Sequence, residues 1–164
     1  MAERRVIGVD PGPVPGMVEL RFVDGRLVGV EVVQCSHGIA AEVFSALLGS
    51  AYATPTLVQV ERFVVGRSSM KSAEPGAITR DMVGALGLAF EDYDSTEKGR
   101  LGGRFLQRSA SQVKPWATDA RLEIAGLLEA TKGMRHAKDA ARHALFAACN
   151  DGGIPDPLSK DWTR

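Results

Sequence analysis

The chain has 164 residues and a mass of 17.5 kDa, with 45% hydrophobic and 24% charged residues, which suffices for one compact domain and not for two. It has no apolar run near the ~18 residues of a membrane span, no signal-peptide-like start and no CxxC pair, so we expect a soluble cytoplasmic protein without disulfides or zinc. Lys and Arg total 20, as do Asp and Glu, and this zero net charge by itself disfavours nucleic-acid binding, which needs clustered cations.

The spacing of apolar residues predicts strands and helices in the order βββαβαβαα. In chain order we expect strands at 5–10, 17–23 and 27–33, a helix from the cap Ser36 to Leu48, a strand at 56–63, a helix at 77–90, a strand at 104–110, and helices at 118–130 and 134–150. Asp24-Gly25 favours the type I′ turn of a hairpin between the second and third strands. This order predicts one α/β domain with a mixed sheet over residues 1–153, followed by an extended C-terminal tail over 154–164.

Three acidic residues interrupt apolar surroundings. Asp10 ends the first strand, Glu61 ends the fourth, and Asp139 lies in the Ala-rich last helix. If the first and fourth strands are neighbours, Asp10 and Glu61 project from one sheet edge, within reach of one hard cation such as Mg²⁺. The helical period places His136 and His143 on the same face as Asp139. The pattern is therefore a candidate divalent-metal site.

Each acid also has an ordinary structural interpretation. Asp10 precedes Pro11-Gly12, where Asp is favoured because its side chain hydrogen-bonds the backbone of a turn. Asp139 can pair with Arg135 or His143 one helical turn away, the commoner role of a helical carboxylate. Two strand-end acids combined with a helical His-x-x-Asp are harder to explain by chance than any one of them, so we favour the metal site.

The zero net charge conceals a segregated pattern. Residues 98–114 contain five basic residues and no acid, directly after a run that carries Glu91, Asp92, Asp94 and Glu97. A second basic cluster surrounds the single acid Asp139 and consists of Lys132, Arg135, Lys138 and Arg142. Because the cations are concentrated in two segments, a nucleic-acid partner is compatible with the sequence after all.

Four short motifs are spread over residues 5–150: IGVDPG at 7–12, VQVERF at 58–63, ASQVK at 110–114 and HAKDAARHAL at 136–145. In this order they resemble the RuvC family of Holliday-junction resolvases, which are ribonuclease H-like nucleases, and most of all its small phage-encoded members. Each motif is short, but the combination is fairly specific. The resemblance implies a ribonuclease H-like α/β fold, with a five-stranded mixed sheet of order 3-2-1-4-5 flanked by helices. A phage protein would act in the cytoplasm of the host cell.

The resemblance implies an endonuclease that resolves four-way junctions and related branched DNA by two-metal hydrolysis of phosphodiesters. The catalytic residues, which also bind the metal, would be Asp10, Glu61, His136 and Asp139. Two Mg²⁺ ions would occupy the site, with Mn²⁺ as a substitute, and His136 would either bind metal or transfer protons. His143 would support one of these ligands or be an ordinary core histidine.

The resemblance also implies a DNA-binding surface and a homodimer. Lys114 resembles a basic residue near the DNA backbone, and Phe63 resembles an aromatic residue that stacks at the junction crossover, although it follows the Glu after two residues instead of three. The expected DNA-binding residues are Arg62, Phe63, Arg67, Lys71, Arg80, Arg104, Arg108 and Lys114. Symmetric cleavage requires two active sites, which a dimer supplies. The predicted helix 77–90 would form the dimer interface or serve as a core helix.

Two other functions remain open. The same site could act on forks, flaps or structured RNA, or the chain could be a catalytically silent junction-binding protein that kept the fold. Retention of four candidate ligands disfavours the silent protein. The neutral charge predicts weak, salt-sensitive binding of ordinary duplex, so affinity would come from the shape of the junction.

Overall fold

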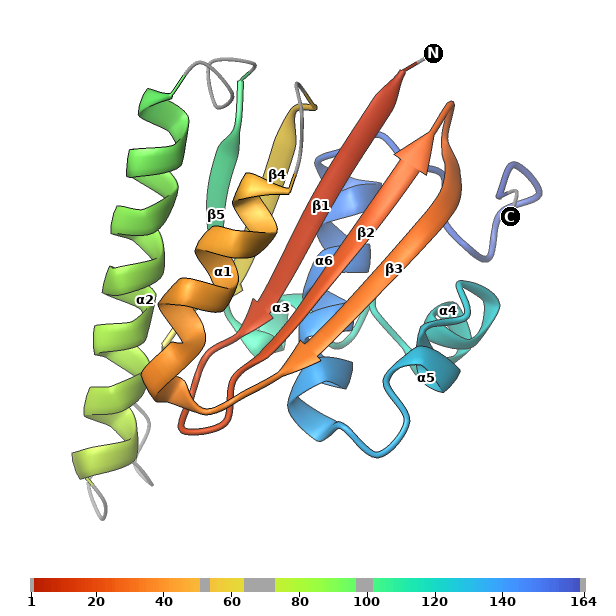
Figure 1. Ribbon diagram of the computed structural model, residues 1–164. Helices are drawn as coiled ribbons and strands as arrows, with labels where there is room; N and C mark the ends of the chain where they lie inside the picture. Colours follow the sequence, from red (N-terminus) through yellow and green to blue (C-terminus); the bar gives the residue numbers. More distant parts are fainter. Residues whose placement is uncertain (1, 51–53, 64–72, 97–101, 163–164) are drawn as a thin grey trace.

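A five-stranded sheet organises the chain, which the computed structural model describes at residues 2–50, 54–63, 73–96 and 102–162 (Figure 1). Its strands are β1 (Glu3–Asp10), β2 (Gly16–Val23), β3 (Arg26–Gln34), β4 (Thr56–Glu61) and β5 (Arg104–Arg108). The spatial order is β3-β2-β1-β4-β5. The first three strands pair antiparallel, whereas β4 pairs parallel with both β1 and β5. The predicted mixed sheet and its strand order are confirmed.

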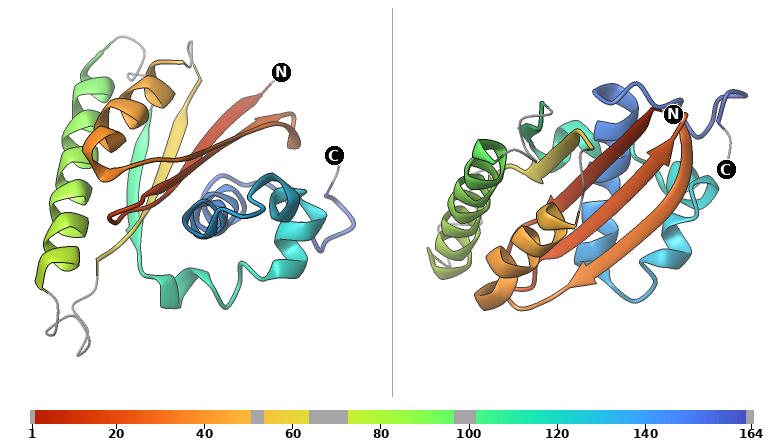
Figure 2. Two further views of the ribbon diagram at one scale, coloured as in Figure 1. Left: turned by 60° about the horizontal axis from the view of Figure 1, so that its bottom comes forward. Right: turned by 45° about the horizontal axis from the view of Figure 1, so that its top comes forward.

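Helices cover both faces of this sheet. They are η1 (His37–Ile39), α1 (Ala40–Gly49), α2 (Ala73–Ser95), α3 (Ala110–Val113), α4 (Asp119–Ile124), α5 (Leu127–Ala130) and α6 (Arg135–Asn150). Figures 1 and 2 show α1 and α2 together on one face and α6 on the opposite face, with α4 and α5 beside it. None of the helices in the described ranges has the length and apolar character needed to cross a bilayer.

Three local predictions can be compared with the backbone. Asp24 and Gly25 have φ values of 49° and 81°, as both central residues of a type I′ turn require. The predicted helix 118–130 is wrong in one respect, because Gly126, with φ of 76°, separates α4 from α5. The predicted strand 104–110 ends early, at Arg108. Ser109 instead precedes α3, and its backbone N–H donates to Oε1 of Gln112 at 2.9 Å.

Alternating strand residues form two cores, one on each face of the sheet. The core under α6 includes Val6, Leu20 and Phe22 together with the alanines of that helix. The core on the other face includes Ile7, Val9 and Val58 from the strands, Phe44 from α1, and Met82, Leu86 and Phe90 from α2. The apolar stripe of the predicted helix 77–90 therefore packs inward, and Leu88 is the large apolar residue of α2 that is most exposed, at 65%.

Two glycines allow α6 to lie directly on β1 and β2. A Cβ on Gly8 would lie 2.1 Å from the carbonyl oxygen of Ala140, and a Cβ on Gly16 would lie 2.2 Å from the carbonyl carbon of His136. No real Cβ tolerates such distances, so any larger residue would push the helix away. This close approach brings the N-terminal half of α6 over the end of β1.

The C-terminal segment packs against the domain as far as it is described. Ile154 is buried in the core under α6. The Trp162 ring meets the Phe22 ring edge-on, with centroids 6.4 Å apart. Arg121 of α4 forms an ion pair with Asp156 at 2.8 Å. Residues 154–162 thus contribute contacts to the α6 face of the sheet.

Candidate active site

The acidic residues singled out by the sequence lie at the ends of two adjacent strands. Because β1 and β4 run parallel and Val9 pairs with Val60, Asp10 and Glu61 follow at the same edge of the sheet. Each lies on the face covered by α6, which contributes His136, Asp139 and His143. Strand pairing and the close packing of α6 therefore bring all five predicted residues to one region of the molecule.

Asp10 is the most buried of the three acids, and it contacts His136. Nδ1 of His136 lies 2.8 Å from Oδ2 of Asp10. Burial raises the pKa of Asp10 from 3.8 to about 6, with the hydrogen bond to His136 opposing this rise and the negative charges of Glu61 and Asp139 adding to it. Asp10 is therefore close enough to Glu61 and Asp139 for their negative charges to disfavour its ionisation.

Glu61 contacts the other histidine of α6. Nε2 of His143 lies 3.1 Å from Oε2 of Glu61, and the His143 side chain is completely buried. Within the described part of the chain, Nδ1 of His143 has no hydrogen-bond partner. Glu61 is thus the polar contact of a histidine that is otherwise surrounded by the core.

Asp139 is held by two cations. Its carboxylate accepts from Nζ of Lys114 at 3.1 Å and from a guanidinium nitrogen of Arg142 at 2.6 Å. Burial raises the pKa of Asp139, but Lys114 and Arg142 outweigh burial and hold this pKa below its usual value. Asp139 is therefore ionised at neutral pH. Its partners are Lys114 and Arg142, and not Arg135 or His143, which the helical spacing suggested.

The donor atoms of this region fit a divalent cation. Carboxylate oxygens are the ligands that Mg²⁺ and Mn²⁺ prefer, and imidazole suits Mn²⁺. A cation beside Asp10 would offset the repulsion that contributes to its raised pKa. Among the residues that the structure describes, no three His, Cys, Asp or Glu side chains are already grouped to hold a metal ion. The complete ligand set stays a prediction.

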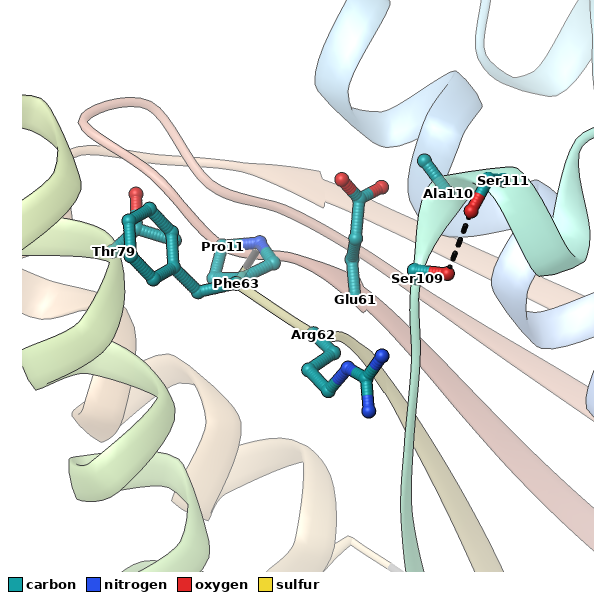
Figure 3. A pocket seen from close by; sticks show the side chains of 8 residues that line it. All are labelled: Pro11, Glu61, Arg62, Phe63, Thr79, Ser109, Ala110 and Ser111. Atoms are coloured by element: carbon teal, nitrogen blue, oxygen red, sulfur yellow. Dashed lines mark hydrogen bonds between the residues drawn. The ribbon is translucent and has the colours of Figure 1, made fainter. Parts of the chain in front are cut away.

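A hollow of about 360 Å³ opens beside Glu61 (Figure 3). Its lining consists of Pro11, Glu61, Arg62, Phe63, Thr79, Ser109, Ala110 and Ser111. In Figure 3 the Glu61 carboxylate points up between Pro11 and Ala110, the Phe63 ring lies near Thr79 and Pro11, and Arg62 points the other way. Our sequence reasoning missed the hydroxyls of Thr79, Ser109 and Ser111. Ser109 and Gln112 have the Ser-x-x-Gln spacing that is typical of a helix start, and this spacing could have located the two serines.

The predicted DNA-binding residues are dispersed over the structure. Arg62 and Phe63 border the hollow, Lys114 lies on Asp139, and Arg80 is exposed on α2. Arg104 is exposed at the start of β5, far along the strand from Glu61. Arg67 and Lys71 lie outside the described residues.

Arg108 faces Glu61 across the β4–β5 pair but uses its guanidinium internally. It forms two hydrogen bonds to the Asp151 carboxylate, at 2.7 and 2.9 Å, and a third to Gln59 at 2.6 Å. Its side chain is therefore directed away from the carboxylates and toward the residue that follows α6.

A five-stranded mixed sheet of this order, with acids at the ends of β1 and β4 and a third on the helix across it, defines a ribonuclease H-like fold. No protein-family model matches the chain, and no curated protein matches it. Among solved structures, the chain is similar to T. thermophilus RuvC in complex with a Holliday junction substrate. The TM-score is 0.62 and the identity 21%, over 94% of this chain and 99% of that one. The RuvC-like fold expected from the motifs is confirmed.

Proposed function

We propose that the chain is a metal-dependent endonuclease that cuts branched DNA, with the four-way junction as its principal substrate. The observation that carries the proposal is that His136 and Asp139 of α6 lie near the sheet edge formed by Asp10 and Glu61, in a fold shared with RuvC. That RuvC structure contains a Holliday junction substrate. The charges of these residues support the same function. Several carboxylates at one place favour a bound cation, and a phosphodiester can bind to that same cation.

Asp10, Glu61 and Asp139 would hold Mg²⁺ or Mn²⁺, with His136 as the fourth ligand or as a proton carrier. When bound, the metal supplies a Lewis acid that activates water and neutralises the charge developing on the phosphate. His136 orients the Asp10 carboxylate through the 2.8 Å contact. His143 limits the rotation of Glu61 from the buried side.

The cations beside the acids have a role with the substrate. Lys114 is 44% exposed, so its ammonium can contact solvent and a phosphate as well as Asp139. Arg142 is 17% exposed and also bonds the Ala117 carbonyl, which keeps it on the protein. We therefore assign substrate binding to Lys114 and the orientation of Asp139 to Arg142.

Symmetric cutting of a junction would require a homodimer, with one site in each copy. The inward packing of Met82, Leu86 and Phe90 leaves Leu88 and the exposed side of α2 as the part of that helix available to a second copy. The chain would act in the cytoplasm, which is the host's if the source is a phage.

The test is incubation of the purified chain with a synthetic four-way junction, a flap, a fork, a structured RNA and a linear duplex, in Mg²⁺, Mn²⁺ or EDTA. We expect metal-dependent paired nicks across the junction. Preferential cutting of flaps, forks or RNA would assign the same site to another substrate. Tight junction binding without cutting in either metal would identify a catalytically silent binding protein and contradict the proposal.

A further inference from the structure

A second hollow lies between α5 and the start of α6, the helix that carries His136 and Asp139. Its volume is about 420 Å³, and its lining includes Leu128, Lys132, Gly133, Met134, Arg135 and Lys138. Figure 1 shows the connection from α5 to α6 at the same end of the molecule as the C-terminal end of β1. His136, which contacts Asp10, directly follows Arg135 in the chain. We refer to this feature as the α5–α6 hollow.

Three cations surround the α5–α6 hollow, and their charges are only weakly neutralised. Lys132 is 76% exposed and pairs at 3.5 Å with Glu129, which is 82% exposed. Lys138 pairs at 3.0 Å with Asp119, which is 57% exposed and is shared with Arg142. Exposed pairs of this kind contribute little free energy, so water or another anion competes with them readily.

Arg135 is the cation without such a partner. It is exposed, and no ion pair joins it to an acid within the described ranges of the chain. The acids that pair with these three cations are Glu129 and Asp119, and neither acid lines the hollow. This local excess of positive charge exists although the whole chain is neutral.

The base of the hollow is apolar and anchored. Leu128 and Met134 are partly buried and pack against the core under α6. Gly133, with φ of 78°, makes the turn between the two helices. The first turn of α6 is fixed from the other side by Gln34, whose Oε1 accepts from the backbone N–H of His136 at 3.2 Å. The three cations therefore project from a rigid support rather than from a loose loop.

We propose that the α5–α6 hollow binds the phosphate backbone of one arm of the branched DNA, next to the site of cutting. The inference rests on the proposed function and adds a second contact surface to it. Lys138 and Arg142 share the Asp119 carboxylate, and Arg142 also pairs with Asp139 at 2.6 Å, so side-chain contacts connect the hollow with the metal-binding region. This placement favours DNA over an acidic peptide, since a peptide would have no reason to be bound beside a phosphodiester-cutting site.

The decisive measurement is the salt dependence of junction binding, because each phosphate contact contributes about 0.9 to the slope of log affinity against log salt. The variant is Lys132→Gln, Arg135→Gln and Lys138→Gln combined. Its matched control removes three exposed cations elsewhere, as Arg21→Gln, Arg26→Gln and Lys160→Gln combined. Affinity for a labelled four-way junction is measured by fluorescence anisotropy in EDTA, so that cutting does not interfere.

We expect the slope of the hollow variant to be smaller than that of the wild type by about 2.7. Between about 50 and 200 mM salt the wild type would then lose about 40-fold more affinity than the variant. The control keeps the slope of the wild type. The single variant Arg135→Gln, at an exposed position, is expected to lower the slope by about 0.9 and guards against a fold defect in the triple variant.

Equal slopes for the wild type and both hollow variants would overturn this inference alone. Equal decreases of the slope in the hollow variant and the control would also overturn it, because they would show that binding depends on total charge and not on the hollow. If the hollow variant lost binding of poly-glutamate and kept that of DNA, the occupant would be an acidic peptide and the inference would be wrong. A wild type that binds no branched DNA would contradict the proposed function as well.

Discussion

Nε2 of His143 lies 3.1 Å from Oε2 of Glu61, across the interface between α6 and β4. The histidine is completely buried, whereas the Glu61 side chain is 26% exposed at the edge of the hollow in Figure 3. An imidazole N–H that donates to a carboxylate from the buried side restricts the rotation of that carboxylate. Such a contact leaves the other oxygen of Glu61 available to a cation. We therefore propose that His143 is a positioning residue for Glu61.

Substitution of His143 by Leu should lower metal-dependent cleavage by about 10- to 100-fold, the usual effect of losing a residue that orients a metal ligand. His143→Gln, whose amide can still donate to Glu61, should retain more activity than His143→Leu. The rate is measured under single-turnover conditions on a junction, and Mg²⁺ affinity by calorimetry.

The control for this prediction is His37→Leu, which changes an exposed histidine. A structural role alone would lower the melting temperature of both His143 variants without separating them in Mg²⁺ affinity. Wild-type affinity in a folded His143→Leu protein would show that Glu61 does not depend on the histidine.

Asp10 should destabilise the metal-free fold at neutral pH. Burial raises the pKa of Asp10 from 3.8 to about 6. The hydrogen bond to His136 partly offsets this rise, and the negative charges of Glu61 and Asp139 add to it. Because the folded state holds this proton more tightly than the unfolded state, stability falls as pH rises from about 4 to about 6. A shift of about two pKa units corresponds to about 3 kcal/mol. Asp10→Asn should gain as much as that near pH 7, and little near pH 4.

The measurement is urea unfolding in EDTA at the two pH values, compared with the wild type. Asp81→Asn, at an exposed position of α2, is the control and should change stability by less than about 0.5 kcal/mol at either pH. The interpretation fails if Asp10→Asn is no more stable than the wild type near neutral pH. The same variant should bind the junction and lose cleavage.

The sheet and the position of the acids could be predicted because each has a local signal. The β-branched run before Asp10, the Asp24-Gly25 turn and the acid at the end of the fourth strand all depend on near neighbours in the chain. The motifs then supplied the strand order. The helical period also correctly placed His136, Asp139 and His143 on one face.

Arg142, one partner of Asp139, lies three residues away in α6, within reach of a prediction from helical spacing. The other partners could not be predicted in this way, because they come from distant segments. Asp139 pairs with Lys114, 25 residues away, and Glu61 with His143, 82 residues away. Arg108 was expected to face DNA, but Asp151 lies where it can accept two hydrogen bonds from it. Side-chain direction of this kind depends on which helix end packs against which strand, and the composition of a short segment does not contain that information.

Removing one partner of the buried ion pair between Arg5 and Glu19 should destabilise the fold strongly. The two side chains are 2% and 3% exposed and lie 2.6 Å apart beneath α1. Arg5 also donates to the Leu48 carbonyl at 3.2 Å and to the Ser50 hydroxyl at 2.8 Å. Removing Glu19 leaves a buried guanidinium without its counter-charge.

Glu19→Ala should therefore lower the free energy of unfolding by about 3–5 kcal/mol, measured by urea denaturation. Glu129→Ala, which breaks an exposed pair with Lys132, should change it by less than about 1 kcal/mol. The double variant Arg5→Met, Glu19→Leu should recover most of the loss, since both buried charges are then gone. A loss in the double variant as large as that in Glu19→Ala would mean that packing, and not charge, sets the cost.

The contact between Gly8 and α6 predicts opposite effects for two Gly→Ala substitutions. A Cβ at Gly8 would lie 2.1 Å from the Ala140 carbonyl oxygen, whereas nothing lies within 4 Å of a Cβ at Gly84 on α2. Gly8→Ala should destabilise the fold by about 3 kcal/mol, the upper end for overpacking, and Gly84→Ala should stabilise it by about 0.5–1 kcal/mol through helix propensity. Because the fold can accommodate the added methyl group only by moving α6 away from β1, a Gly8→Ala protein that remains folded should also bind Mg²⁺ more weakly. Wild-type stability in Gly8→Ala would mean that α6 does not lie as close to β1 as this structure places it.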